Sequence, residues 1–281
     1  MSDYLLRSQA PLTAEEWQAL DQAVVQVARR TLVARRFLTI FGPLGAGVQH
    51  LNADRYLATQ AARISAFGAE GEDILFPESR RCVPLPILYR DFRLSWRDLE
   101  TSRRLGMPLD TTAAAIAATH VATLEDRTIL NGNDEQQQVG FLNFADRLRV
   151  PLGHWDQPGG PFAAILSAVT ELVGHSMREP FTVVVPPPLF VRLNRVFDNT
   201  GVLEIDQVRR LVGGEVYMSP TLPPGVAVVV APGTENMDLA VAQDIVTAFL
   251  ETEAMEHNLR VLEIASLRIK RPGAVCTLGQ V

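Results

Sequence analysis

The chain has 281 residues, 47% of them hydrophobic and 21% charged, a composition ordinary for a globular protein with one large or two modest domains. The formal charge of −6 disfavours nucleic-acid partners, which require a basic face. No long apolar run suggests a signal peptide or membrane span, and two cysteines, Cys82 and Cys276, make no disulfide framework. We therefore expect a cytoplasmic protein that binds neither nucleic acid nor membranes.

The first predicted element is a helix over residues 14–36. Thr13 is a suitable N-cap, and Glu16 three residues later completes a capping box. Apolar or small side chains recur at helical spacing on one face, which consists of Trp17, Leu20, Val24, Val27 and Thr31. The opposite face is polar and consists of Glu15, Gln18, Gln22, Gln26 and Arg29. One stripe of this helix should therefore pack against another element.

Residues 49–82 differ in character from the rest of the chain. They are rich in alanine, glycine and charged residues and poor in large apolar ones, so they can hardly form a core of their own. A structureless loop of this length is improbable inside a compact domain. We expect an extended arm that packs on a neighbouring subunit.

The middle and the end of the chain mix helices and strands. Residues 83–98 alternate polar and apolar side chains, which predicts a strand with Trp96 on its apolar face. A long helix is predicted over about 110–131, with Asp110 as N-cap and Gly132 in its stop signal. Later helices are predicted at 161–174, 187–197 and 204–212, and strands at 181–185, 215–218, 226–231, 237–256 and 259–270.

The usual signatures of catalysis are missing from the sequence. It has no phosphate-binding loop, dinucleotide fingerprint, nucleophile elbow or zinc-binding histidine pair. Glu253, Glu256 and His257 are close in sequence, but we interpret them as a solvated strand end. Glu125 and Asp126 are adjacent and point to different faces of a helix, so a salt bridge or a helix-surface role is expected rather than paired acid–base work. We expect no enzyme, no catalytic residue and no metal site.

Segments spread over nearly the whole chain resemble family 1 encapsulins, the linocin-like shell proteins. In chain order these segments are 5–21, 29–45, 86–92, 125–132, 140–142, 180–185, 200–205 and 236–244. No single segment is decisive, whereas their order and spacing together are specific. The variants at 29–33, 42–49 and 235–241 are most similar to the myxobacterial type, whose partners include ferritin-like iron oxidases.

The resemblance implies an α+β fold of the HK97-like phage-capsid type, with a P-domain, an extended E-loop and an A-domain. The division we expect places the N-terminal helix and the start of the P-domain in 1–48, the E-loop in 49–82, the P-domain with its spine helix in 83–148, the A-domain in 149–230 and a return to the P-domain in 231–281. One repeated surface that meets heterologously would close such subunits into a shell.

The same resemblance implies a function. The chain would be the subunit of an icosahedral nanocompartment that self-assembles and encloses cargo through C-terminal targeting peptides, for iron storage or protection against oxidative stress. The expected cargo is a ferritin-like protein or a peroxidase, and any iron is bound by that cargo, so the shell itself takes no cofactor. Two other classes stay open: a phage or prophage major capsid protein that packages DNA, and a protease or bacteriocin-type enzyme.

Two sites follow from the resemblance. The cargo peptide would dock in a groove between the N-terminal helix and the P-domain, on Leu20, Val24, Val27, Leu32, Arg35 and Ile40. Aliphatic side chains would take its apolar anchors, and Arg35 would bind its backbone or a carboxylate. The turn of Asp198, Asn199, Thr200 and Gly201 would lie at a pore, where a ring of Asp198 favours cations. The alternatives are intramolecular packing for the first site and a plain exposed turn for the second.

Overall fold

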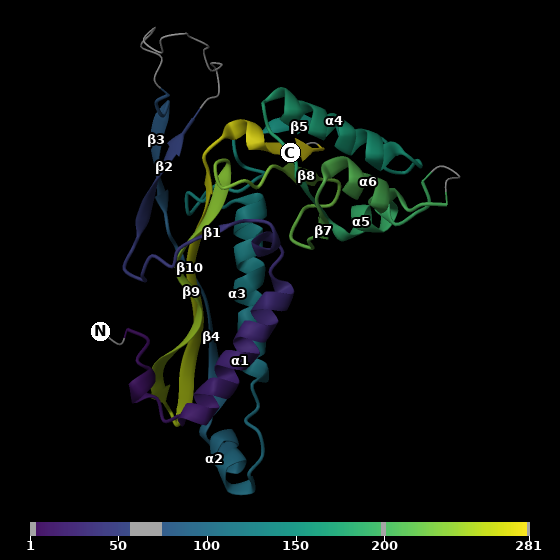
Figure 1. The fold of residues 1–281 in the computed structure, drawn as a ribbon. Helices are drawn as coiled ribbons and strands as arrows, with labels where there is room; N and C mark the ends of the chain where they lie inside the picture. Colours follow the sequence, from purple (N-terminus) through teal and green to yellow (C-terminus); the bar gives the residue numbers. More distant parts are fainter. Residues whose placement is uncertain (1–3, 57–74, 198–200, 280–281) are drawn as a thin grey trace.

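The computed structural model describes residues 4–56, 75–197 and 201–279. Figure 1 shows three parts: a long narrow sheet flanked by helices, a second sheet with its own helices at one end, and a two-stranded arm beside that end. The architecture is the predicted mixture of helices and strands. None of the described helices is both long enough and apolar enough to cross a membrane.

The long sheet has the strand order β1-β9-β10-β4. Its strands are β1 (Ile40–Phe41), β4 (Ile87–Ser95), β9 (Met237–Glu253) and β10 (Glu256–Ile269). Strands β9 and β10 form one long antiparallel hairpin, β4 pairs antiparallel with β10, and the short β1 runs parallel to β9. The long closing strands therefore lie at the centre of the sheet, as β-branched and aliphatic runs of this length predict.

Two long helices, α1 (Ala14–Thr31) and α3 (Thr112–Asn131), pack on this sheet (Figure 1). The capping box of α1 is confirmed, because the Glu16 amide donates to Thr13 Oγ1 at 3.2 Å and the Thr13 amide to Glu16 Oε2 at 2.7 Å. Helix α1 ends five residues earlier than predicted, since Leu32 is extended and the short turn η2 (Ala34–Arg36) follows. Helix α3 stops at Gly132 as predicted.

Two details around α3 and β4 differ from the sequence prediction. Asp110 accepts the Thr112 amide at 2.9 Å, but it lies one residue before the N-cap position. The predicted strand 83–98 is interrupted after Pro84, resumes at Ile87 and ends at Ser95. The Ser95 hydroxyl accepts the Arg97 amide, and helix α2 (Trp96–Leu105) begins there. Trp96 is therefore the first residue of a helix and is 39% exposed, not a strand residue on the apolar face.

A second sheet of five strands has the order β5-β11-β8-β6-β7. Its strands are β5 (Leu148–Val150), β6 (Thr182–Val185), β7 (Val216–Met218), β8 (Ala227–Val230) and β11 (Val275–Leu278), and its helices are α4 (Gly160–Gly174), α5 (Pro187–Leu193) and α6 (Glu204–Val212). Strands β6, β8 and β11 are fully buried. Helix α5 is shorter than the predicted 187–197.

The last strand departs from the expected division of the chain. Strands β9 and β10 lie in the long sheet, as the expected return of 231–281 requires. Strand β11 instead pairs with β5 and β8 inside the five-stranded sheet, after a short turn η3 (Pro272–Ala274). The physical reason is its composition, because Val275, Cys276 and Leu278 are each 0% exposed and fill the core of that sheet.

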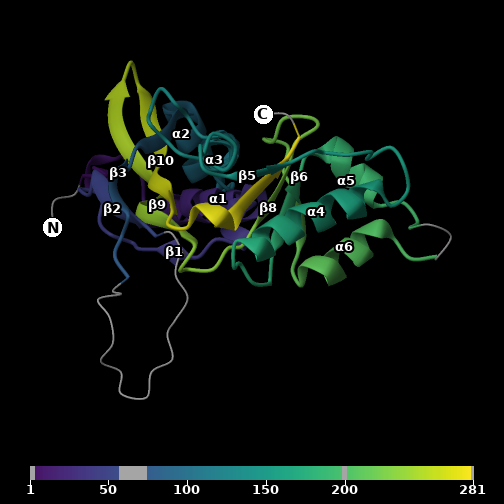
Figure 2. The same ribbon diagram turned by 90° about the horizontal axis from the view of Figure 1, so that it is seen from above.

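The arm consists of β2 (His50–Arg55) and β3 (Ser79–Pro84), which pair antiparallel in a sheet of their own. Most residues of these strands are at least partly exposed. Figures 1 and 2 show the ribbon leaving the side of the long sheet. The predicted lack of a core in this segment is confirmed for its described residues, and residues 57–74 lie outside the described part.

Candidate functional site

Helix α1 directs its apolar stripe into the core of its own chain. Leu20 is 0% exposed and Val24 is 1% exposed. Both belong to a cluster with Phe92 of β4 and Leu259 of β10. A side chain without exposed surface cannot reach a bound peptide, so at these two positions the structure contradicts the expected open groove and supports intramolecular packing.

A groove does run along α1, but on another side of the helix. It has a volume of 340 Å³ and is lined by residues of α1, the turn η2 and strand β9, namely Val25, Ala28, Arg29, Leu32, Arg35, Arg36, Asp244 and Ile245. Leu32 and Arg35 are thus the two expected residues that reach this groove. Val27 packs half-buried against the core, and Ile40 is 45% exposed in strand β1, outside the groove.

Sequence reasoning missed most of the groove because it lies next to the polar face of α1. Val25 is 40% exposed although it is aliphatic. The available signal for it was an aliphatic residue at helical spacing from Gln18, Gln22 and Arg29 on the polar face. No such signal marked Asp244 and Ile245, because only the fold brings β9 beside α1.

Arg35 lies in an ion cluster built from four separate segments. Its Nε is 2.9 Å from Glu125 Oε1 of α3, one terminal nitrogen is 2.7 Å from Asp244 Oδ1, and the other pairs with Glu263 of β10. Glu125 and Glu263 are almost completely buried, whereas Asp244 is 63% exposed. Three carboxyl groups thus already occupy this guanidinium, which fixes the end of α1 to the sheet and leaves little capacity for a peptide carboxylate.

The neighbouring Asp126 fixes the chain just after α1. Its two carboxylate oxygens accept the backbone amides of Val33 at 2.8 Å and Ala34 at 2.9 Å. Glu125 and Asp126 therefore serve different partners, as adjacent helix positions predict, and the expected salt bridge is confirmed for Glu125. The corner between α1 and η2 depends on a side chain more than 90 positions away in sequence.

Burial raises the pKa of two of these carboxyl groups, Asp126 and Glu263. Desolvation raises the pKa of Asp126 to about 7, although its two amide donors act in the opposite direction. Desolvation, followed by repulsion from Glu125, raises the pKa of Glu263 well above its ordinary value. The buried Glu263 carboxyl is therefore protonated more readily than an exposed glutamate.

The expected pore residues fall largely outside the described chain. Asp198, Asn199 and Thr200 are not described, and Gly201 is exposed with a positive φ of 73°. The flanking residues close a hairpin, in which the Phe197 amide donates to the Val202 carbonyl at 2.8 Å. A pore at this turn stays a prediction.

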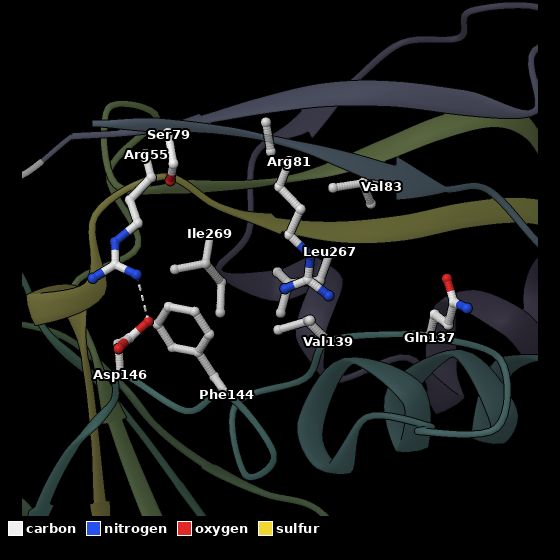
Figure 3. Close-up of a pocket in the computed structure, with 11 residues that line it drawn as sticks. Arg55, Ser79, Arg81, Val83, Gln137, Val139, Phe144, Asp146, Leu267 and Ile269 are labelled. Carbon is white, nitrogen blue, oxygen red and sulfur yellow. Dashed lines mark hydrogen bonds and ion pairs between the residues drawn. The ribbon is translucent and has the colours of Figure 1, made fainter. Parts of the chain in front are cut away.

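A small pocket lies where the arm meets the body (Figure 3). It encloses 120 Å³ between β2 and β3 on one side and β10 and residues 137–146 on the other. Arg55 contacts Asp146 at 2.7 Å, and the Tyr56 amide donates to the Lys270 carbonyl at 3.1 Å, so the base of the arm is fixed to the body. Arg81 extends into the pocket between apolar walls (Figure 3).

Nothing in the described chain assembles a metal centre. Its histidine, cysteine, aspartate and glutamate side chains do not gather in groups of three or more that could hold an ion. His257, singled out with Glu253 and Glu256, contacts Thr252 Oγ1 through Nδ1 at 2.9 Å. Burial lowers the pKa of His257. The interpretation as a solvated strand end fits Glu253, which is exposed, and is wrong for His257, which is 8% exposed.

Comparison with known proteins identifies the relationship. Residues 1–266 match the family described as "Encapsulating protein for peroxidase" (Linocin_M18). The type 1 encapsulin shell protein EncA of Myxococcus xanthus is 44% identical over 99% of this chain and 97% of its own. A diheme-cytochrome-encapsulin shell fusion protein of Kuenenia stuttgartiensis is 37% identical over 97% of this chain and 75% of its own.

Solved structures confirm the predicted capsid fold of the HK97 type. The virus-like particle of Pyrococcus furiosus has a TM-score of 0.76 at 18% identity, over 94% of this chain and 100% of its own. The capsid of Myoviridae phage XM1 has a TM-score of 0.65 at 11% identity, over 88% and 91% of the two chains. At such identities the likeness concerns the fold alone.

The family match and the names of the relatives decide among the functional classes considered. The relatives are named as shell proteins, and this confirms the prediction that the chain is a shell subunit and not an enzyme. The alternatives of a DNA-packaging phage capsid and of a protease or bacteriocin-type enzyme are wrong for the same reason. With a capsid fold and a match over almost its full length, this chain belongs to the encapsulin family of shell proteins.

Proposed function

We propose that this shell subunit encloses cargo proteins by binding their C-terminal targeting peptides in the groove between α1 and β9. The observation that carries the proposal is the groove itself, which remains open after α1 has buried its apolar stripe in the core. It is large enough for a few side chains and not for a folded domain. A short extended peptide fits these dimensions.

The lining of the groove suggests the chemistry of the peptide. Val25 and Ile245 supply apolar contacts on which aliphatic anchors of a peptide would pack, and Leu32, which is 5% exposed, lies behind them. Arg29 and Asp244 also line the groove, and 63% of the Asp244 side chain is exposed. A peptide with aliphatic anchors and charged groups of both signs complements this arrangement.

For the cargo we propose a ferritin-like protein or a peroxidase, with iron storage or protection against oxidative stress as the outcome. The support is the description of the family as encapsulating peroxidase and the similarity to the myxobacterial shell protein. Iron is held by the cargo in this proposal. The free thiols of Cys82 and Cys276 suit assembly in the reducing cytoplasm.

The test is co-production of the shell with a ferritin-like protein and, separately, a peroxidase, each carrying its own C-terminal peptide. Val25→Asp places a charge on the apolar wall and should reduce cargo per shell at least tenfold while shells still form. Gln18→Asp, an equally acidic change on the exposed side of the same helix, is the matched control and should load normally. Normal loading of the Val25→Asp shells would overturn the groove assignment.

A further inference from the structure

Two unpartnered surfaces lie at the same end of the long sheet. One is the turn of the β9–β10 hairpin, and the other is helix α2 (Figures 1 and 2). The register fixes them relative to each other, because Glu256 at the start of β10 pairs with Ser95, the N-cap of α2. Both lie at the opposite end of the sheet from the five-stranded domain (Figure 1).

The hairpin turn presents an exposed apolar side chain among acidic ones. Met255 is 60% exposed and has a φ of 66°, a left-handed conformation that a turn ordinarily assigns to glycine or asparagine. Glu251 and Glu253 are exposed, and Glu256 is half-buried. None of the three glutamates forms an ion pair with any described residue, so their negative charges are free for an external partner.

Helix α2 presents the complementary surface. A groove of 440 Å³ along it is lined by Trp96, Arg97, Glu100, Thr101, Arg104 and Leu105. Leu105 is 67% exposed, and the Arg104 side chain is 83% exposed. Arg97 has no ion pair within the described chain. Arg104 lies 4.0 Å from Glu100, which also lines the groove, so the two arginines leave a net positive charge beside an aromatic and an aliphatic wall.

We infer that the β9–β10 turn of one subunit docks in the α2 groove of a neighbouring copy. Met255 would enter this groove and pack on Leu105, where its flexible thioether side chain gains burial. The glutamates of the turn would face Arg97 and Arg104. The inference rests on the shell function already assigned and adds to it the pair of surfaces that meet.

The placement of the two surfaces determines the kind of assembly they would make. They are different patches of one chain, so the contact is heterologous, and every subunit contributes a turn to one neighbour and a groove to the other. Because both patches lie at one end of the molecule, a rotation axis beside that end brings each turn to the next groove. The contacts close into a ring where the rotation from one subunit to the next divides a full turn evenly.

A charge exchange tests the pairing. Glu251→Arg with Glu253→Arg gives a basic turn against a basic groove, and Arg97→Glu with Arg104→Glu gives an acidic turn against an acidic groove. Each pair of changes should lower the assembled fraction at least tenfold in sedimentation and electron microscopy. All four changes in one chain restore opposite charges and should recover at least half of the parent's assembly. Circular dichroism separates failure to assemble from failure to fold.

A covalent test does not depend on charge. In a Cys82→Ser background, Met255→Cys with Leu105→Cys should give a ladder of disulfide-linked subunits on a non-reducing gel after mild oxidation, whereas Leu105→Cys alone should not. The inference would be overturned, and the shell function left intact, if both charge-reversed variants assemble normally and the cysteine pair gives no ladder. A parent chain that forms only monomers would instead overturn the shell function.

Discussion

Leu20 offers a sharp test of how α1 divides its surface between the core and the cargo groove. It is 0% exposed and packs against the long sheet, so Leu20→Ala should destabilise the subunit and leave the groove intact. Loss of three buried carbons at about 0.8 kcal/mol each costs about 2.4 kcal/mol. Incomplete closure of the cavity raises the loss of unfolding free energy to about 3 kcal/mol, within the roughly 2–5 kcal/mol typical of such changes.

The assay compares thermal unfolding of parent and variant shells at equal concentration, together with cargo per shell. At about 2–4 °C per kcal/mol for a chain of this size, the midpoint should fall by about 6–12 °C. Val25→Ala is the control, because Val25 is 40% exposed and should cost less than about 1 kcal/mol. A Leu20→Ala shell that unfolds within about 2 °C of the parent yet loses its cargo would refute the assignment of Leu20 to the core.

Three further predictions concern the N-cap of α1, the ionisation of Asp126 and the reactivity of the two thiols. Thr13→Ala removes the N-cap of α1 and should lower the free energy of unfolding by about 1 kcal/mol in urea titrations, whereas Thr13→Ser should restore it. Asp126 has a folded pKa of about 7, above its unfolded value, so ionisation costs the folded state more and the contribution of Asp126 to stability falls as pH rises from about 4 to about 7. The stability difference between parent and Asp126→Asn should therefore shrink over that range, and a constant difference in pH-resolved melting would contradict the assignment. Exposed Cys82 should react with a thiol reagent in dissociated subunits, while Cys276, buried and with its pKa raised by desolvation to about 12, should react only after unfolding. Protection of Cys82 on assembly would show that the arm packs on a neighbour, and equal reactivity in shells and subunits would show that this part of β3 stays open.

The parts of the fold that could be predicted are those with local signals. Helix α1 has a capping box and an apolar stripe, and both are visible without a structure. Helix α2 was missed although Ser95 and Asp98 have the spacing of a capping box, because Leu99 is its only buried residue and the helix therefore has no apolar stripe. Strands β5 and β11 have three and four residues, so only their hydrogen-bonded partners identify them.

The site was harder to predict than the fold, for a physical reason. The apolar stripe of a helix is the surface that usually packs in the core of the same chain. Leu20 and Val24 belong to this stripe, whereas the groove lies on another side of α1. The groove is defined by contacts between α1 and β9, which are separated by about 200 positions in sequence. The ion cluster around Arg35 joins four segments in the same way. The spacing of residues along the sequence does not indicate such contacts between distant segments.

The position of β11 has a consequence for synthesis of the protein. This strand is not an edge but lies between β5 and β8, so the five-stranded sheet is divided until residues 275–278 have left the ribosome. The long hairpin and its helices are complete earlier in the chain. A nascent subunit therefore cannot present a finished second sheet before residues 275–278 have emerged, and until then the unpaired edges of β5 and β8 are exposed at the stage when such edges are most prone to aggregate.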